Sequence, residues 1–358
     1  MRAFLKYTLF VFLILLFSAI LIEIGLGIAF RIKDRNVQAM NVKDFPYIYF
    51  SFEKDEFSNA DGIKTTKSIT KEPGKFRIVL IGGSVARGSG NTETIANFLE
   101  KELNDALATD KIEVINAGMS AFVAEQEFIF TQLVLQKYEP DMVIGLDGYN
   151  DLLTWRINRF TTESPFMLPP HNYAQFRVIR DGKYQKSFIS RFTGFYKNIG
   201  RVVHYYERKS LEKKFNWDSI GLPEKADVSA TYWSVIQDTR DFCTAKKIDY
   251  YSFLQPIRFY GDRSDTSKLT KEQRGMSSIY MLMELETLEK GYSHSLAKLF
   301  KARKEVFMDD CHVNVEGNQI IAKEMAKFLQ PKLEDYLTPA GVPDLQGIPD
   351  DVAFPEGI

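Results

Sequence analysis

Five residues in this sequence have the side-chain types and the spacing of an acyl-transfer site. They are Ser84 in IGGS, Gly118 in NAG, Asn150 in GYND, and Asp309 and His312 in DDCH. A serine hydroxyl becomes a good nucleophile when an imidazole takes its proton, and a carboxylate holds that imidazole in the required tautomer. A glycine N–H and an asparagine amide can donate to the oxyanion that develops on the attacked carbonyl. The set predicts catalysis by Ser84, Asp309 and His312.

The glycine-rich turn around Ser84 reads GGSVARGSG. It is no phosphate loop of pattern G-x-x-x-x-G-K-S/T, because Ser89 stands where the lysine is required. It also fails the dinucleotide pattern G-x-G-x-x-G, because Ser84 takes the place of the second glycine. The turn therefore either is structural or exposes Ser84 as a nucleophile, with backbone N–H groups at a helix start to receive an oxyanion.

His312 favours the second interpretation. Of the four histidines, it alone directly follows an expected strand and has a carboxylate three residues before it. On a turn, that spacing lets Asp309 reach Nδ1 of the imidazole and fix the tautomer. Asp310 is the alternative orienting acid, or it caps the helix that follows. The remaining histidines are His171, His204 and His294.

Strand-like and helix-like segments alternate along the chain, which predicts a parallel sheet covered by helices on both faces. In such sheets the site forms at the carboxyl ends of the strands, and all four motifs, IGGS, NAG, GYND and DDCH, lie at the carboxyl ends of expected strands. The expected strands are 77–82, 112–116, 141–146, 248–256 and 305–309. The expected helices are 94–107, 122–137, 228–246, 271–300 and a last one that Pro331 should kink.

A long irregular insert, 152–227, breaks this alternation. Its segment 177–214 carries eleven Lys or Arg against three acids, with aromatic residues between them. Because it leaves the third strand beside Asn150, the insert should rim the site and could hold an acidic polysaccharide or lie on anionic lipid headgroups. The alternative is a solvated face whose aromatic residues pack inward. The candidate substrate contacts are Arg177, Arg180 and Lys183.

The N-terminal segment is long and apolar enough to cross a membrane. Between Lys6 and Arg31 lie 24 residues with Glu23 as the only charge, and such a helix reaches about 36 Å. A cleaved signal peptide is the alternative, but the apolar run is long for one and no clear cleavage site follows. Positive charges flank the run almost equally. We expect one uncleaved anchor and a catalytic domain outside the cytoplasm.

The composition of the whole chain bounds what else it can be. With 358 residues and a net charge of −1 it can hold a large core and gives no reason to expect a nucleic-acid partner. Cys243 and Cys311 are too few for a disulfide framework, so we expect two free, buried thiols, and no metal or cofactor. The expected organisation is an anchor at 7–30, an extension at 31–75, a catalytic domain at 76–336 and a disordered tail at 337–358.

The four segments resemble, in order, the signature blocks of the SGNH (GDSL-like) hydrolase family. This resemblance implies a flavodoxin-like three-layer α/β/α sandwich with a parallel five-stranded sheet, and a serine that cleaves esters. It also implies an oxyanion hole made by the N–H groups of Ser84 and Gly118 and the side chain of Asn150. Gly83 departs from the family's namesake, which has Asp before the serine. Similar GGS variants occur in membrane-anchored bacterial members linked to envelope glycans.

We therefore expect a membrane-anchored serine esterase that removes acetyl or another small acyl group from a carbohydrate or cell-envelope glycan. Its expected partners are that acylated substrate and the membrane. The alternatives are an O-acyltransferase acting on an exported polysaccharide, a lysophospholipase or thioesterase, and a non-catalytic scaffold that binds glycan. The α/β-hydrolase fold is a rival scaffold, but Ala86 stands where its G-x-S-x-G turn requires the last glycine.

Overall fold

The computed structural model describes residues 2–34, 42–45, 47–54, 56–88, 93–158, 206, 220–261 and 269–337. The insert expected at 152–227 is therefore described only at its two ends and at Tyr206. The tail expected at 337–358 lies outside the described residues after Leu337. The candidate substrate contacts Arg177, Arg180 and Lys183 also lie outside them.

A parallel sheet of five strands forms the centre of the molecule, with the strand order β4-β3-β5-β6-β7. Numbered along the chain, this is the order 2-1-3-4-5 of flavodoxin-like folds, so the expected fold class is confirmed. The strands are β3 (Phe76–Gly82), β4 (Ile112–Asn116), β5 (Met142–Asp147), β6 (Asp249–Leu254) and β7 (Ser293–Ser295).

The fifth strand was expected at 305–309, and that prediction is wrong. Those residues begin in a short 3-10 helix, η5 (Lys304–Val306), and Phe307 then forms an isolated antiparallel bridge with Val313. The segment folds back on itself instead of joining the sheet. The true fifth strand, β7, has three residues, Ser-His-Ser, which are too few and too polar to show a strand pattern.

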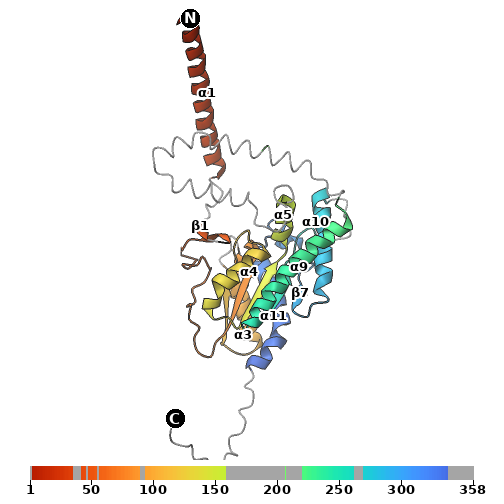
Figure 1. The fold of residues 1–358 in the computed structure, drawn as a ribbon. Coiled ribbons are helices and arrows are strands. Elements are labelled where there is room, and N and C mark those ends of the chain that lie inside the picture. Colours follow the sequence, from red (N-terminus) through yellow and green to blue (C-terminus); the bar gives the residue numbers. More distant parts are fainter. Residues whose placement is uncertain are drawn as a thin grey trace, which may run out of the picture.

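Helices cover both faces of the sheet (Figure 1). On one face lie α3 (Ile95–Ala106) and α11 (Val315–Leu337), which continues through Pro331. On the other lie α4 (Ala124–Leu133), α9 (Leu222–Ala245) and α10 (Lys271–Thr287). Three short helices follow strands or helices at the edges: α2 (Ser84–Arg87), η1 (Leu135–Tyr138) and α5 (Tyr149–Asn158).

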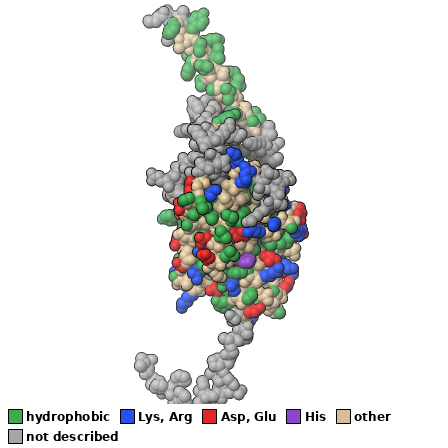
Figure 2. All heavy atoms as spheres, turned by 90° about the vertical axis from the view of Figure 1, so that its right-hand side faces the viewer, with side chains coloured by type: hydrophobic (Ala, Val, Ile, Leu, Met, Phe, Trp, Pro, Cys, Tyr) green, Lys and Arg blue, Asp and Glu red, His purple; other side chains and the backbone are tan. Residues whose placement is uncertain are grey.

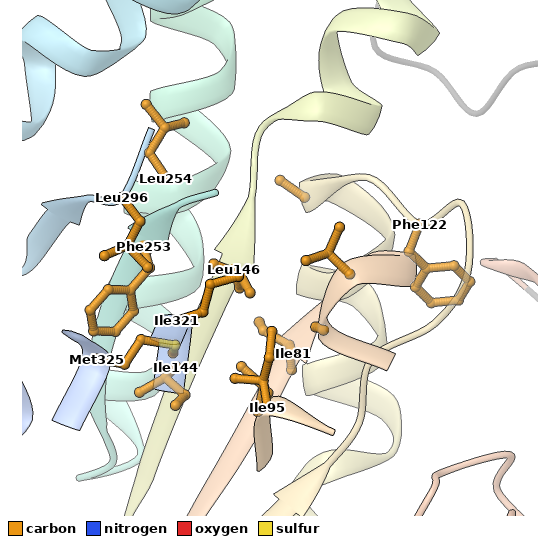
Figure 3. Packing of buried hydrophobic residues seen from close by; sticks show 14 of the residues in the cluster. Ile81, Ile95, Phe122, Ile144, Leu146, Phe253, Leu254, Leu296, Ile321 and Met325 are labelled. Carbon is orange, nitrogen blue, oxygen red and sulfur yellow. The ribbon is translucent and has the colours of Figure 1, made fainter. Parts of the chain in front are cut away.

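Apolar side chains fill the space between the sheet and the helices. Figure 3 shows Met325 and Ile321 of α11 against Ile144 of β5, with Phe253 of β6 beside them, and all four are fully buried. Helical spacing places Ile321 and Met325 on the same face of α11. The two cysteines, Cys243 and Cys311, are also buried and unpaired, as expected.

Part of the segment expected to be an extension packs onto the sandwich. The hairpin of β1 (Val42–Phe45) and β2 (Tyr49–Phe52) is followed by a loop that returns to the sheet. In this loop Lys64 forms an isolated bridge with Asn116 at the end of β4. The buried apolar residues of this segment are Ile48, Phe50, Phe52 and Ile63.

The N-terminal helix α1 (Arg2–Asp34) projects away from the sandwich (Figure 1). Apolar side chains cover it, whereas acidic and basic side chains are mixed over the described part of the face of the sandwich that Figure 2 shows. Within the described part of the chain, it is the one helix long and apolar enough to span a membrane, over Lys6–Ala29. A signal sequence would have the same properties.

Candidate active site

Ser84 is the first residue of α2, and only Gly83 separates it from the end of strand β3. The turn before it depends on glycine. Gly82 has φ +149°, and a β-carbon there would come within 2.7 Å of the carbonyl oxygen of Leu146 and 2.6 Å of the β-carbon of Ala86. Without that carbon the chain turns sharply off the strand, and the serine stands at the carboxyl edge of the sheet.

His312 and Asp309 reach this serine from a distant part of the chain. His312 Nε2 lies 2.6 Å from Ser84 Oγ, although 228 residues separate them. His312 Nδ1 lies 2.6 Å from Asp309 Oδ2. Because an ionised carboxylate can only accept, Nδ1 carries the ring proton and Nε2 is the free acceptor for the serine hydroxyl. The three side chains thus form a continuous Ser-His-Asp relay.

The backbone of the same turn holds the Asp309 carboxylate. Its other oxygen, Oδ1, accepts from the N–H groups of Cys311 at 3.0 Å and His312 at 2.8 Å. Partial burial by itself would raise the pKa of Asp309, but these donors and the His312 ring outweigh it and hold the pKa below its usual value. Asp309 is therefore ionised at neutral pH, as an orienting acid must be.

Asp310 neither orients His312 nor caps the helix that follows. Its carboxylate accepts from Gln273 Nε2 at 3.4 Å, and its carbonyl accepts from the N–H of Arg258 at 2.9 Å. The start of α11 is capped instead by Asn314, whose Oδ1 accepts from the N–H of Gly317 at 2.9 Å. Asp309 is the residue that orients His312.

His294 is the other histidine in the described part of the chain, and it does not contact Ser84. His294 lies on β7 and packs its ring against Phe253 and Phe328. Burial lowers the pKa of His294, so this half-buried ring is neutral at physiological pH and packs against the core. His171 and His204 lie outside the described residues.

Asn150 approaches the serine turn from the start of α5. Its Nδ2 donates to the carbonyl oxygen of Phe122 at 2.8 Å, which identifies the amide nitrogen and leaves its second N–H for another acceptor. A β-carbon at Gly83 would lie only 2.4 Å from this nitrogen. The absence of a side chain at Gly83 therefore leaves room for the Asn150 amide beside the turn that carries Ser84.

Gly118 lies against the backbone of α2. A β-carbon there would meet the backbone nitrogen of Arg87 at 2.4 Å, so no other residue fits without a shift. In the structure the N–H of Gly118 donates to Asn116 Oδ1 at 3.1 Å. Gly118 can donate to an oxyanion only when Asn116 releases or shares this N–H.

Two residues that the motifs did not identify hold the Gly118 loop in place. Asn116 makes the bond just described, and an asparagine two residues before a turn glycine was its only signal in the sequence. Arg87 donates to the carbonyl oxygens of Gly118 at 3.2 Å and Gly62 at 3.0 Å, while its guanidinium lies 3.5 Å from the centre of the Phe52 ring. Arg87 thereby ties the N-terminal hairpin to the site.

The ligand atoms of Asp309, Cys311 and His312 lie within 4.8 Å of one another, a spacing that could hold a metal ion. The chemistry of these donors favours the hydrogen-bonded relay instead. Burial raises the pKa of the Cys311 thiol, so the thiol of the metal-free site is protonated. The Nδ1 atom of His312, 3.7 Å from the sulfur, is already paired with Asp309.

The fold and the site together define a flavodoxin-like α/β protein with a Ser-His-Asp relay at the carboxyl edge of its sheet. No family model matches the chain, and no curated protein matches it. Several solved structures are similar. The acetyl xylan esterase AlAXEase is 14% identical, with a TM-score of 0.41, and the match covers 70% of this chain and 98% of that one.

Two further structures match to a similar extent. An acetyl xylan esterase from Geobacillus stearothermophilus is 14% identical over 73% of this chain and 97% of that one, with a TM-score of 0.40. A GDSL-like lipase from Bacteroides thetaiotaomicron is 12% identical over 73% of this chain and 89% of that one, with a TM-score of 0.35. With TM-scores this low, the function proposed below rests on the geometry of the relay.

Proposed function

We propose that the protein is a serine esterase, an enzyme that cleaves ester bonds through an acyl-serine intermediate. The observation that carries this proposal is the pair of 2.6 Å contacts that join Ser84 Oγ to His312 Nε2 and His312 Nδ1 to Asp309 Oδ2. A serine that serves only as a turn residue has no need of an imidazole whose tautomer is fixed by an ionised carboxylate.

The reaction follows from these contacts. His312 Nε2 takes the hydroxyl proton as Ser84 Oγ attacks the ester carbonyl, and the carbonyl electrons move onto the oxygen. When the tetrahedral intermediate collapses, His312 gives that proton to the leaving alcohol, and the acyl group stays on Ser84. Water then repeats the sequence, with His312 as base, and releases the carboxylic acid and free Ser84. Asp309 stabilises the transient imidazolium throughout.

In this proposal the oxyanion is received by the N–H of Ser84 at the start of α2, the second N–H of Asn150 Nδ2, and the N–H of Gly118. Asn150 is the donor whose position is best supported, because its amide lies beside Gly83 and the carbonyl of Phe122 holds it there. Gly118 contributes only if Asn116 shares its N–H, since the two are bonded in the structure. Removal of one such donor costs about 10²–10³ in kcat.

For the substrate we propose a small acyl ester on a carbohydrate or cell-envelope glycan. The side chains of Asp309 and His312 are 56% and 29% exposed, so a bulky polymer can present a peripheral ester to them. Transfer of the acyl group to a glycan hydroxyl would use the same intermediate but requires exclusion of water. The open relay favours hydrolysis.

We further propose that α1 tethers the domain to the membrane as a single uncleaved span, with the domain outside the cytoplasm. The apolar length of α1 supports a span, and an extracytoplasmic site would meet envelope glycans directly. The basic insert with Arg177, Arg180 and Lys183 stays a predicted contact for an acidic glycan. Cell fractionation, with a protease-accessibility assay on intact cells, tests the tether and its orientation.

The enzyme proposal is tested by labelling with a fluorophosphonate and by hydrolysis of p-nitrophenyl acetate. Wild type, Ser84→Ala and Ser278→Ala are compared, because Ser278 is also half-buried but lies on α10, where it donates to the carbonyl of Gly275. We expect Ser84→Ala to lose both the label and the hydrolysis, while Ser278→Ala keeps both. Equal labelling and rates in wild type and Ser84→Ala would remove the proposal.

A further inference from the structure

Asp151 follows Asn150 in α5 but turns its side chain to a different partner. Its Oδ1 accepts from the N–H of Ala124, 27 residues away, at 3.0 Å, and its carboxylate also accepts from the backbone N–H of Gly148 and from its own. The side chain is buried, with 6% of the residue exposed. One carboxylate thus binds the loop that carries Asn150 and the first residue of α4.

Asn150 and Asp151 are adjacent, and both bind the segment 122–124, one as a hydrogen-bond donor and the other as an acceptor. Asn150 donates to the carbonyl of Phe122 at 2.8 Å, and Asp151 accepts from the N–H of Ala124 at 3.0 Å. Two such bonds fix both the distance and the rotation between the segments, whereas one alone would leave Asn150 free to pivot. Below, the paired bonds are called the 150–151 clamp.

The start of α4 needs this carboxylate. The residue at its N-cap position, Val123, has no side-chain oxygen to accept from the first N–H groups of the helix. Those N–H groups and the helix dipole both favour an anion at that end. Asp151 supplies it from α5, so the cap of α4 and the placement of Asn150 depend on the same side chain.

We propose that Asp151 is a positioning residue that acts through Asn150 and holds the amide at the oxyanion site by way of the 150–151 clamp. The proposal rests on the proposed esterase function. Loss of the carboxylate releases the 122–124 segment, the Phe122 carbonyl moves, and the Asn150 amide loses the acceptor that sets its orientation. Asp151 touches no reacting atom in this scheme.

Glu127 is a matched control for burial and charge. It lies one turn further along α4, is 2% exposed, and belongs to the same group of buried acids as Asp151. Unlike Asp151, it faces a second buried acid, Asp147, and its carboxyl group receives no backbone N–H among the described residues. Glu127→Gln therefore replaces a buried acid close to Asp151 without breaking the clamp.

The decisive experiment is a double-mutant cycle on p-nitrophenyl acetate hydrolysis by the full chain in detergent. We expect Asp151→Ala to lower kcat by roughly 10–10²-fold with KM little changed, since a small displacement of an aligned group has such a cost. In an Asn150→Ala background, Asp151→Ala should cost less than about 3-fold more, because its effect passes through Asn150. Asp151→Asn, which keeps an acceptor for Ala124, should recover most of the rate.

Two outcomes overturn the proposal. The first is a kcat of Asp151→Ala that equals that of wild type or of Glu127→Gln. The other is an Asp151→Ala loss that is as large in the Asn150→Ala background as in wild type, which indicates a general structural role. If Asp151→Ala does not fold, Ala124→Pro takes its place, because it deletes the donor while proline suits the first position of a helix. Val123 is extended, with φ −111° and ψ 162°, as a residue before proline should be.

Hydrogen exchange separates failure of the clamp from failure of the esterase function. In Asp151→Ala the amide of Ala124 and its neighbours should exchange faster than in wild type and in Glu127→Gln, whatever the enzyme does to esters. If Ala124 exchanges faster in Asp151→Ala but the wild-type protein hydrolyses no ester, the clamp exists and has no role in catalysis. Unchanged exchange at Ala124 would remove the clamp itself.

Discussion

Replacement of Gly83 by alanine should disable the enzyme by moving the Asn150 amide. The added β-carbon would lie 2.4 Å from Asn150 Nδ2, whereas atoms of this size pack at about 3.5 Å. The nitrogen must therefore retreat by about 1 Å. Gly83 has φ −76°, so the turn does not require a positive φ at this residue.

The displacement of the Asn150 amide should lower kcat. Nδ2 is bonded to the Phe122 carbonyl at 2.8 Å, and a movement of about 1 Å breaks that bond and takes the donor away from the oxyanion. Loss of one donor costs about 10²–10³ in kcat, and a misplacement of about 1 Å costs about 10². We expect a fall of about 10²-fold, equivalent to about 2.7 kcal/mol of transition-state stabilisation.

Steady-state hydrolysis of p-nitrophenyl acetate measures this effect. The variants are Gly83→Ala, Asn150→Ala and the double variant, with Gly291→Ala as the control, because an added carbon at Gly291 meets no atom within 4 Å. The double variant should be no worse than Asn150→Ala by more than about 3-fold. Wild-type kcat in Gly83→Ala, or costs that simply multiply in the double variant, would refute the steric reasoning.

Ser84→Ala and His312→Ala should each lower kcat by on the order of 10⁶, and together by no more than either alone, because they act as a unit. Asp309→Asn should lower kcat by about 10⁴ through the wrong tautomer of His312, measured by the same assay. Burial raises the pKa of Asp147 from 3.8 to about 7, so the folded chain keeps a proton that the unfolded chain loses; the free energy of unfolding should fall as pH rises from about 4 to about 7. Asp147→Asn should flatten that fall in urea titrations, and an unchanged slope would contradict the assignment.

Much of the fold could be predicted because a buried parallel strand needs a nearly continuous apolar run. The runs at 77–82, 112–116 and 141–146 agree with β3, β4 and β5 to within a residue or so. β7 escaped prediction because a three-residue edge strand carries too little apolar sequence to form a pattern. The error moved the expected strand to 305–309, although the side chains of Asp309 and His312 still lie in contact, as their spacing implied.

Part of the geometry of the candidate site could be predicted for a similar reason. Asp309 and His312 are close in sequence, and their spacing on a turn already implied contact, which the 2.6 Å distance between Oδ2 and Nδ1 bears out. Arg87 and Asp151 could not be identified from sequence, because an arginine or an aspartate in a short helix is common. Their partners, Gly62 and Ala124, lie 25 and 27 residues away.

The sequence by itself determined which residue types stand at strand ends, and hence the chemistry that this protein can attempt. Strand patterns and short-range spacing are local properties, so they survive without knowledge of the fold. Only the tertiary structure decided that Ser84 and His312, 228 residues apart, stand within 2.6 Å, and that Gly83 leaves room for Asn150. Such contacts depend on strand order and packing, where a shift of about 1 Å already changes the rate.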